Sequence, residues 1–431
     1  MQQIIFLFFL TLRLFLSASD TFSVSLDTET PLDPIYVTPI EGSAFDQKYS
    51  EELIRILSYD LNHNGRSVTV RSSEKALYII KWSVQSKTIQ PTLYVVHERK
   101  SKKIDSFTFT GKINQDRRLI HQIADTLFKS IYGTEGVAST TILYTVREKN
   151  QDPVFKSEYL SEVWQCDFDG HNPRQVTHEG RYIVTPCYVP AKKGFRPGSF
   201  LFVSYKLGQP KIYLGSLEDG SSHQLLSLRG NQFMPAITRS KADIAFICDA
   251  MGNPDLFIVP YNDDLGVGKP RQIFASPRGT QGSPCFSPDG RQIAFVSNKD
   301  GNTRVYMMDI PSPHILLKEM SPRLISRACR ESTSPSWSPD GRKIAYAGLI
   351  AGTRQIFVYD RDSQTEEQIT TDKSNKENPC FAADSFHIVF NADQSGGKAQ
   401  LAVVNLKQKE TVLISEGNTD KRFPSAEPLV K

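Results

Sequence analysis

The sequence predicts an α/β N-terminal domain followed by an all-β six-bladed propeller. Three observations support this fold class: a repeat with a period of 44 to 51 residues, two incomplete repeat units at opposite ends of the repeat region, and a front segment with helical periodicity. The chain has 431 residues, of which 39% are hydrophobic. It is therefore long enough for two or three domains with sizeable cores.

The repeat is the strongest signal in the sequence. Residues 284–297 (PCFSPDGRQIAFVS) recur as residues 335–346 (PSWSPDGRKIAY). Weaker copies begin at Pro186, Pro235 and Pro379, so that successive copies start 49, 49, 51 and 44 residues apart. A period of about 40–50 residues with several short strands in each unit is typical of a β-propeller.

Each repeat unit is expected to form four strands. The first turn, Ser-Pro-Asp-Gly, suits a tight bend because proline presets φ, aspartate bonds its own backbone and glycine adopts positive φ. The run that follows, residues 293–296 (Ile-Ala-Phe-Val), is apolar on both strand faces. Such a strand must be covered on both sides, as a propeller blade is covered by its two neighbours.

The ends of the repeat region predict how the propeller closes. Residues 142–144 and 163–165 match the second and third strands of a unit, but no first strand precedes them. Residues 423–428 (Phe-Pro-Ser-Ala-Glu-Pro) resemble a first strand with nothing after it. We therefore predict that the C-terminal strand completes the first blade, which gives six blades. An open β-sandwich or a solenoid would need no such half-units.

The front segment, residues 35–133, is predicted to be a small α/β domain. Residues 35–38 form a strand, and Ser43 and Asp46 mark the start of a helix that Asn62-His-Asn-Gly65 ends. A second helix covers residues 114–132 and ends at Gly133. Between the helices, strands are expected at about residues 67–71, 76–84, 92–98 and 104–110.

The first 19 residues are predicted to be a signal peptide, cleaved before Asp20, because an apolar run over residues 4–16 precedes Ser-Ala-Ser. Arg13 interrupts the run, and a disordered or misassigned start is the alternative. No stretch reaches the ~20 apolar residues of a membrane span, so we expect export without membrane insertion. The predicted boundaries are 1–19 signal peptide, 20–34 acidic N-terminal tail, 35–133 small α/β domain, 134–140 linker and 141–431 six-bladed propeller.

The segment after the predicted cleavage site is acidic. Residues 20–47 hold six acidic residues and no basic one. A linear acidic tail can bind a basic partner or the edge of a partner's sheet. The alternative is that this segment is solvent-exposed, partly ordered chain that binds no partner. The candidate partner-binding residues of the tail are Asp20, Asp27, Glu29 and Asp33.

The loops before the predicted inner strands form the candidate binding surface. Most of these loops carry a basic residue five or six positions before the proline of the inner strand, and the neighbouring candidate residues in the loops are polar. A ring of cations with few acids at a channel mouth would attract an acidic partner segment; the alternative is that surface loops are simply rich in Lys and Arg. The candidate binding residues are Arg181, Arg229, Asn231, Arg278, Thr280, Gln281, Arg330, Glu331, Thr333, Lys376, Glu377, Lys421 and Arg422.

The sequence carries no catalytic signature, and we expect neither an enzyme nor a cofactor. It has no Gly-x-Ser-x-Gly elbow, no His-Glu-x-x-His and no phosphate-binding glycine loop. The sequence also contains no Cys-x-x-Cys pair of the kind that binds zinc. The net charge of +4 gives no reason to expect nucleic acid as a partner, and we expect a monomer.

The six cysteines are expected to be free, buried thiols. Cys187, Cys285 and Cys380 occupy the same position in three different blades. Equivalent atoms of different blades should lie beyond the ~7 Å Cα separation that a disulfide allows. An even number of cysteines in an exported chain would otherwise suggest a disulfide framework.

These features together resemble the TolB family. The resemblance rests on residues 116–128 (DRRLIHQIADTLF), on the Ser-Pro-Asp-Gly repeats and on the terminal Phe-Pro-x-x-x-Pro, and it covers nearly the whole chain. Departures occur at residues 189–198, 238–241 and 382–385, where the tight turn is altered, and at residues 424–427, which lack the usual aromatic. They affect the expected loop geometry rather than the fold.

The resemblance implies a soluble, non-catalytic component of the Tol–Pal system in the periplasm of Gram-negative bacteria. Such a protein binds the lipoprotein Pal at the propeller mouth and the inner-membrane protein TolA through its mature N-terminus, and it supports outer-membrane integrity and cell division. Two other readings stay open: a substrate-gating or regulatory propeller of a peptidase system, and a small-molecule sensor that uses the channel.

Overall fold

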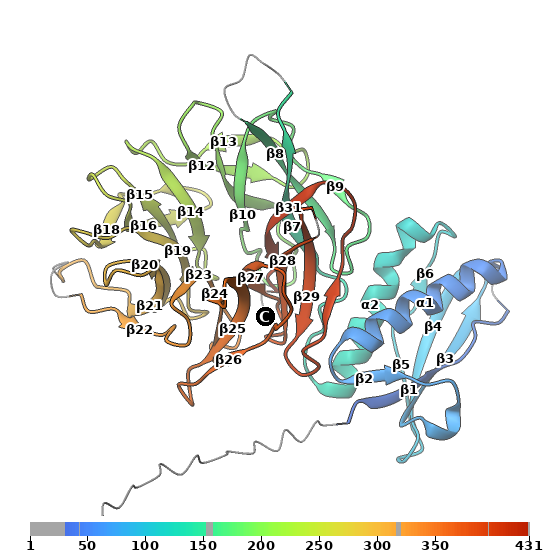
Figure 1. The fold of residues 1–431 in the computed structure, drawn as a ribbon. Helices are drawn as coiled ribbons and strands as arrows, with labels where there is room; N and C mark the ends of the chain where they lie inside the picture. Colours follow the sequence, from blue (N-terminus) through green and yellow to red (C-terminus); the bar gives the residue numbers. More distant parts are fainter. Residues whose placement is uncertain (1–30, 43, 152–157, 316–319, 395, 430–431) are drawn as a thin grey trace, which may run out of the picture. The chain divides into compact units, whose positions relative to one another are not determined.

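The computed structural model describes residues 31–429, except residues 43, 152–157, 316–319 and 395. The predicted signal peptide and the acidic residues Asp20, Asp27 and Glu29 lie outside the described residues. No helix in the described part of the chain is both long and apolar enough to cross a membrane. A small α/β domain precedes a six-bladed β-propeller (Figure 1), which confirms the predicted fold class.

The α/β domain is one mixed sheet with two helices. The sheet order is β2-β1-β3-β4-β5, with β6 paired to β4. Strand β1 runs parallel to β2 and β3, and the other pairs are antiparallel. In chain order the elements are β1 (Asp33–Val37), α1 (Gln47–His63), β2 (Ser67–Thr69), the 3-10 helix η1 (Ser73–Lys75), β3 (Tyr78–Gln85), β4 (Thr88–Val95), β5 (Lys100–Lys103), β6 (Phe107–Thr108) and α2 (Ile113–Tyr132).

The helix boundaries follow from their caps, as predicted. Asp46 precedes α1, and its carboxylate accepts the Tyr49 N–H at 2.7 Å. Gly133 follows α2 with φ at 72°, a left-handed conformation that suits glycine. The apolar faces of both helices, represented by Leu57 and Leu127, pack in one core with the sheet.

Several predicted strand boundaries in this domain are wrong. Strand β1 begins at Asp33 rather than at residue 35, and β4 begins at Thr88 rather than at residue 92. Pro91, which lacks an N–H donor, nevertheless lies inside β4, and its carbonyl accepts the Ile104 N–H at 2.9 Å. The strand expected at residues 104–110 is reduced to β6.

Six antiparallel sheets follow one another around the propeller in sequence order, coloured from green to red in Figure 1. Blade one contains β31 (Asp420–Ala426), β7 (Thr141–Lys149), β8 (Tyr159–Asp167) and β9 (Arg174–Gln175). Blade two contains β10 (Ile183–Tyr188), β11 (Ser199–Ser204), β12 (Lys211–Ser216) and β13 (Ser222–Gln224). Blade three contains β14 (Gln232–Ile237), β15 (Asp243–Cys248), β16 (Asp255–Asn262) and β18 (Arg271–Phe274), with β17 (Gly266–Val267) pairing the end of β16.

The remaining three blades have four strands each. Blade four contains β19 (Gln281–Phe286), β20 (Gln292–Ser297), β21 (Arg304–Asp309) and β22 (Arg323–Leu324). Blade five contains β23 (Glu331–Trp337), β24 (Lys343–Ile350), β25 (Thr353–Asp360) and β26 (Glu366–Gln368). Blade six contains β27 (Lys376–Phe381), β28 (His387–Asp393), β29 (Ala399–Asn405) and β30 (Thr411–Leu413).

The C-terminal strand closes the propeller, which confirms the prediction from the two half-units. Strand β31 pairs antiparallel with β7, so that Ala426 lies opposite Ile142 and Lys421 opposite Val146. Just beyond the strand, the Glu427 carboxylate accepts the Thr141 N–H at 2.9 Å and the Thr141 hydroxyl at 2.8 Å. Blade one is therefore assembled from both ends of the propeller sequence.

The blades are held together by apolar clusters that form between neighbours. Ala294 and Val296 on one face of β20 pack against blade five, while Ile293 and Phe295 on the other face pack against blade three. This two-sided burial explains why the strand is apolar at successive positions. Full burial of one such aromatic or aliphatic side chain contributes about 1.5–3 kcal/mol.

The repeated turn has the predicted structure, and the cysteines are free as predicted. Three of them are buried, whereas Cys187, Cys285 and Cys380 are half-buried residues. Asp289 accepts the Arg291 N–H at 3.1 Å, and Gly290 has φ at 71°. All six cysteines are free. The Cys285 sulfur lies inside the propeller, where it accepts the Trp337 N–H of the next blade at 3.2 Å, and burial raises the pKa of its thiol to about 12.

Candidate functional site

The predicted binding loops all lie at one end of the propeller channel. Successive strands of a blade alternate in direction, so the connections between blades and the turns between second and third strands meet at the same end. We call this end the mouth. The turns after each first and third strand lie at the opposite end.

The innermost strand of every blade bends at the residue before its proline. Six residues with positive φ share this position: Thr185 (52°), Met234 (51°), Ser283 (44°), Ser334 (54°), Asn378 (53°) and Phe423 (55°). The pairing register shifts there in all six blades, which identifies a β-bulge. Neighbouring bulges are in contact, since the Ser283 N–H donates to Met234 Sδ at 3.1 Å. The Ser334 hydroxyl likewise donates to Asn378 Oδ1 at 3.1 Å. The bulges therefore link blade three to blade four and blade five to blade six.

Three predicted binding residues are exposed cations on successive blades. Arg229, Arg278 and Arg330 precede the inner strands of blades three, four and five, and no described residue forms an ion pair with their side chains. In blade two, Arg181 is half-buried and its guanidinium donates to the Gly180 carbonyl at 2.8 Å. The structure thus presents three accessible guanidinium groups at the mouth.

Three polar candidates shape the loops. The Asn231 side chain donates to Asp249 at 2.7 Å, and the Thr280 backbone N–H donates to Asn298 at 2.6 Å. Thr333 is half-buried in β23, where it pairs with Ala347. These contacts connect the loops before the inner strands to the second strands of the same blades.

Three other candidates are buried rather than exposed. Gln281, Lys376 and Lys421 each lie three positions before the proline of their strand, and all are at most 9% exposed. The Lys376 ammonium donates to the Ser374 carbonyl at 3.0 Å, and that of Lys421 donates to the Glu416 carbonyl at 2.9 Å. Burial lowers the pKa of Lys421. Strand alternation points this position into the blade interior, so these side chains hold the loop backbone.

Blades five, six and one carry a mixed-charge network instead of a ring of cations. Its members are Glu331, Arg354, Glu377, Arg422, Asp393, Asp420 and Arg147. Arg422 lies 3.1 Å from Glu377, which lies 3.5 Å from Arg354. Burial on its own would lower the pKa of Arg422, but the surrounding carboxylates raise it. The expectation of few acids at the mouth is therefore wrong for this half of it.

A pocket of about 330 Å³ lies beside the network, where blade one meets blade two. Arg147, Tyr182, Arg422 and Phe423 are among its lining residues. Because Arg422 is engaged by three carboxylates, its guanidinium is held in place beside the pocket.

Comparisons with known proteins agree with this architecture. A family model described as "TolB beta propeller domain" matches residues 128–315 and 311–428. A "Protein TolB homolog" of Protochlamydia amoebophila is 42% identical over 405 residues, which cover 87% of this chain and 86% of the relative. The chain belongs to the TolB family. A "Protein TolB homolog" of Chlamydia pneumoniae is 37% identical over 382 residues, covering 88% of this chain and 86% of the relative.

A solved structure shares the fold of this TolB-family chain. The crystal structure of TolB from Acinetobacter baumannii matches with a TM-score of 0.74 and 17% sequence identity, over 93% of this chain and 98% of that one. The similarity therefore extends across both the α/β domain and the propeller.

Exposed apolar side chains at the mouth of this TolB-family propeller were not predicted from the sequence. Leu207 and Met251 lie in the turns between the second and third strands of blades two and three, and they are 68% and 71% exposed. Met234, on the bulge of blade three, is also exposed. The available signal was an apolar residue directly before the turn glycine, as in Leu207-Gly208 and Met251-Gly252.

One predicted member of the acidic tail belongs to the α/β domain. Asp33 is the first residue of β1, where its N–H donates to the Arg66 carbonyl at 2.8 Å and it lies opposite Ser67. Its carboxylate contributes to the raised pKa of Tyr132, of which burial is the larger cause. Asp33 is thus placed in the sheet rather than in a tail.

Proposed function

We propose that this TolB-family chain is a non-catalytic, periplasmic protein-binding scaffold of the Tol–Pal system. It binds a Pal-like lipoprotein at the propeller mouth and a TolA-like inner-membrane protein through its acidic N-terminal tail. In this role it supports outer-membrane integrity and cell division. Membership of the TolB family supports the assignment to this system.

The observation that carries the binding mode is the composition of the mouth on blades two to five. The exposed guanidinium groups of Arg229, Arg278 and Arg330 share this surface with the exposed side chains of Leu207 and Met251. Arginine and methionine are enriched in protein–protein interfaces, and arginine is among the residues that most often dominate the binding energy. Guanidinium groups also make paired hydrogen bonds with carboxylates, so the favoured partner surface is acidic with an apolar centre.

The mixed-charge network gives the other half of the mouth a different role. Glu377 and Arg422 already satisfy each other, so a partner gains little new charge pairing there. We expect this half to present a fixed shape, and the three unpaired arginines to supply most of the electrostatic attraction. Long-range attraction of this kind raises the association rate and weakens with salt.

The test is calorimetric binding of the periplasmic domain of the cognate Pal to residues 20–431, with Arg229, Arg278 and Arg330 all changed to Glu in a second sample. We expect the parent to bind and the triple variant to lose binding while its thermal unfolding is unchanged. A matched control changes Lys192, Arg291 and Arg342 to Glu, because these exposed cations lie in turns at the opposite end. Absence of binding by the parent, or equal losses in both triple variants, would contradict the proposal.

The tail is tested separately with the periplasmic domain of TolA. Deletion of residues 20–30 should abolish TolA binding, since these residues hold Asp20, Asp27 and Glu29. The Asp33→Asn variant should bind TolA like the parent, because Asp33 belongs to β1. A deletion variant that still binds TolA would remove the tail from the proposal and leave the mouth proposal standing.

A further inference from the structure

A buried cluster of charged residues joins the α/β domain to the propeller. Arg117 and His121 lie one turn apart on α2, and they face Asp169 in the turn between β8 and β9. The Arg117 guanidinium forms an ion pair with Asp169. Asp60 of α1 reaches the same cluster from the other side, with its carboxylate 2.7 Å from His121 Nδ1.

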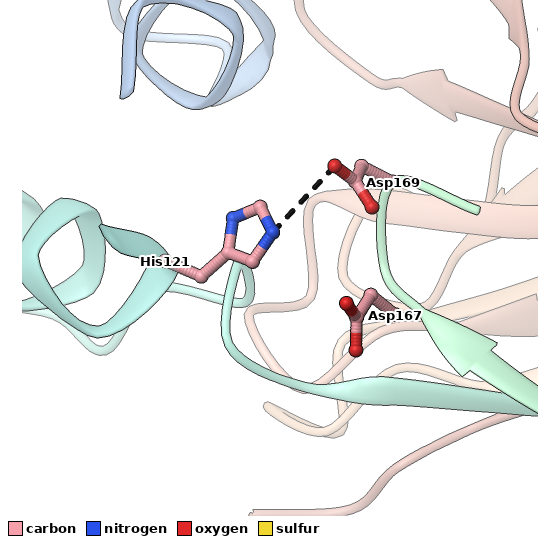
Figure 2. Close-up of side chains that lie close together, drawn as sticks. All are labelled: His121, Asp167 and Asp169. Atoms are coloured by element: carbon pink, nitrogen blue, oxygen red, sulfur yellow. Dashed lines mark ion pairs between the residues drawn. The ribbon is translucent and has the colours of Figure 1, made fainter. Parts of the chain in front are cut away.

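One atom of this cluster lacks a hydrogen-bond partner. His121 is 1% exposed, and its Nε2 makes no hydrogen bond to any described residue. The nearest carboxylate oxygen, of Asp169, is 3.5 Å away. Figure 2 shows the ring turned toward Asp169, with Asp167 nearby at the end of β8. One ligand atom from each of His121, Asp167 and Asp169 lies within 4.8 Å of the other two.

The arrangement around His121 is one that proteins use for metal ligands. A carboxylate on one ring nitrogen, here Asp60 on Nδ1, fixes the proton there and leaves the lone pair of Nε2 available. The burial of an unpartnered ring nitrogen is otherwise costly. Nothing in the local sequence reveals this pattern, because Asp60, His121 and Asp167 are separated by 46 residues or more.

We propose that His121 Nε2 and the carboxylates of Asp167 and Asp169 bind a divalent cation of the zinc class. Imidazole nitrogen and carboxylate oxygen are both ligands of this class, at about 2.0–2.2 Å from the metal. Ligands of a tetrahedral metal at this distance lie about 3.3–3.6 Å from one another. The 3.5 Å between His121 Nε2 and Asp169 already fits this spacing, whereas ligand atoms that are up to 4.8 Å apart would have to approach one another by roughly 1 Å. His171, whose Nδ1 is 3.3 Å from Asp169, is positioned to complete the site, and a water molecule is the alternative fourth ligand.

The charge of the cluster also favours a cation. Asp60, Asp167 and Asp169 supply three negative charges, and Arg117 supplies one positive charge. With a neutral imidazole two negative charges remain, and a divalent cation would compensate both. The competing arrangement is metal-free, with a protonated His121 shared between Asp60 and Asp169.

The position of the site determines what the metal would do. His121 belongs to α2, whereas Asp167 and Asp169 belong to blade one, so the cation would connect the two domains. Metal binding to the folded state stabilises that state. The site would therefore strengthen the contact between the α/β domain and the propeller.

The test titrates Zn²⁺ alone into metal-stripped residues 20–431 by calorimetry, and compares thermal unfolding with Zn²⁺ and with a chelator. We expect one site and a higher unfolding temperature with Zn²⁺. Asp167→Asn, which preserves side-chain shape, should abolish this binding, and Asp60→Asn should weaken it by about 10–100-fold. His121→Gln should also abolish Zn²⁺ binding. If this variant fails to fold because the His121 side chain is buried, Asp167→Asn decides the test.

Two controls distinguish this site from adventitious binding. Asp105→Asn and His97→Gln alter exposed residues of the α/β domain and should leave binding unchanged. No saturable Zn²⁺ binding by the parent would overturn the proposal in favour of the metal-free arrangement. Binding that survives Asp167→Asn, or that His97→Gln removes, would overturn it in favour of a surface site.

Discussion

The imidazole of His387 in blade six donates its Nε2–H to the main-chain carbonyl of His63 at the end of α1, at 2.7 Å. Its Nδ1 lies 2.6 Å from the Asp384 carboxylate. A ring that donates from both nitrogens is positively charged. These two residues are 324 positions apart in the chain, so one protonated side chain links the α/β domain to the propeller.

This link predicts a pH-dependent contribution to stability. Burial on its own would lower the pKa of His387, but Asp384 raises it above its usual value of about 6.5. Because the folded-state pKa is the higher one, the stabilisation is fully present below about pH 6.5 and is lost as pH rises through the folded-state pKa. In urea unfolding, the stability difference between the parent and His387→Asn should therefore be largest below about pH 6.5. The difference should narrow as the pH rises through the folded-state pKa of His387. His178→Asn, at an exposed position, is the control; a gap that widens with pH would contradict the assignment.

Gly170 is predicted to tolerate no side chain. It has φ at 84°, and a Cβ there would lie 1.5 Å from the Ile414 carbonyl oxygen, which is backbone and cannot rotate away. Gly180 has φ at 60° with open space around it. We expect Gly180→Ala to cost about 1 kcal/mol of unfolding free energy from backbone strain alone, and Gly170→Ala to cost about 1–3 kcal/mol more. Equal losses in chemical denaturation would show that the Ile414 contact is unimportant.

Glu427 is predicted to be a main stabiliser of the closing strand. It is 3% exposed and accepts hydrogen bonds from Thr141, and its carboxylate pairs with Arg196. Arg196 is 34% exposed, so it can be solvated once its partner is removed. The main loss is that of the hydrogen bonds to the Glu427 carboxylate, and Glu427→Ala should lower the free energy of unfolding by about 1.5–3 kcal/mol. Hydrogen exchange should increase first at the amides of β31 and β7. Glu218→Ala, at an exposed position, should change neither measurement.

Lys376 and Arg278 should separate stability from binding. Both were candidate binding residues, yet Lys376 is 1% exposed and bonded to Ser374, while Arg278 is exposed. Lys376→Ala should destabilise the propeller by about 1–3 kcal/mol, because the loop carbonyl that it contacts loses its donor. Arg278→Ala should change stability by less than about 0.5 kcal/mol and should weaken partner binding. Binding loss in a stably folded Lys376→Ala would instead place this lysine in the interface.

The exposed apolar residues should matter only at the mouth. Leu207→Ser with Met251→Ser should weaken binding of the proposed Pal-like partner by more than about 1 kcal/mol without changing thermal unfolding. Leu265, which is 87% exposed in the hairpin of blade three at the opposite end, provides the matched control. A Leu265→Ser variant that binds as weakly as the double variant would argue that the partner contacts the other end.

The sequence predicted the propeller well because its signals are local and repeated. The tight turn around Asp289 and the strand around Phe295, which is apolar on both faces, recur in several blades. Strand β31 was recognisable because its sequence matches the first strand of a blade and no second strand follows it. Other features depend on contacts that no local pattern reveals. The bulge residue Phe423 adopts positive φ, which its own residue type disfavours. The position of Lys421 just ahead of Pro424 predicts a surface cation, although strand alternation turns its side chain inward.

Closure by the last strand also constrains the order of events during synthesis and folding. Strands β7 and β8 are made early, but the partner of β7 is β31, which follows about 270 residues later. Until β31 is available, one edge of β7 has no partner, and such edges promote aggregation. From the completion of β7 until the chain is almost finished, the growing protein therefore carries an incomplete sheet. Any factor that shields the β7 edge during export would act on this one vulnerable strand.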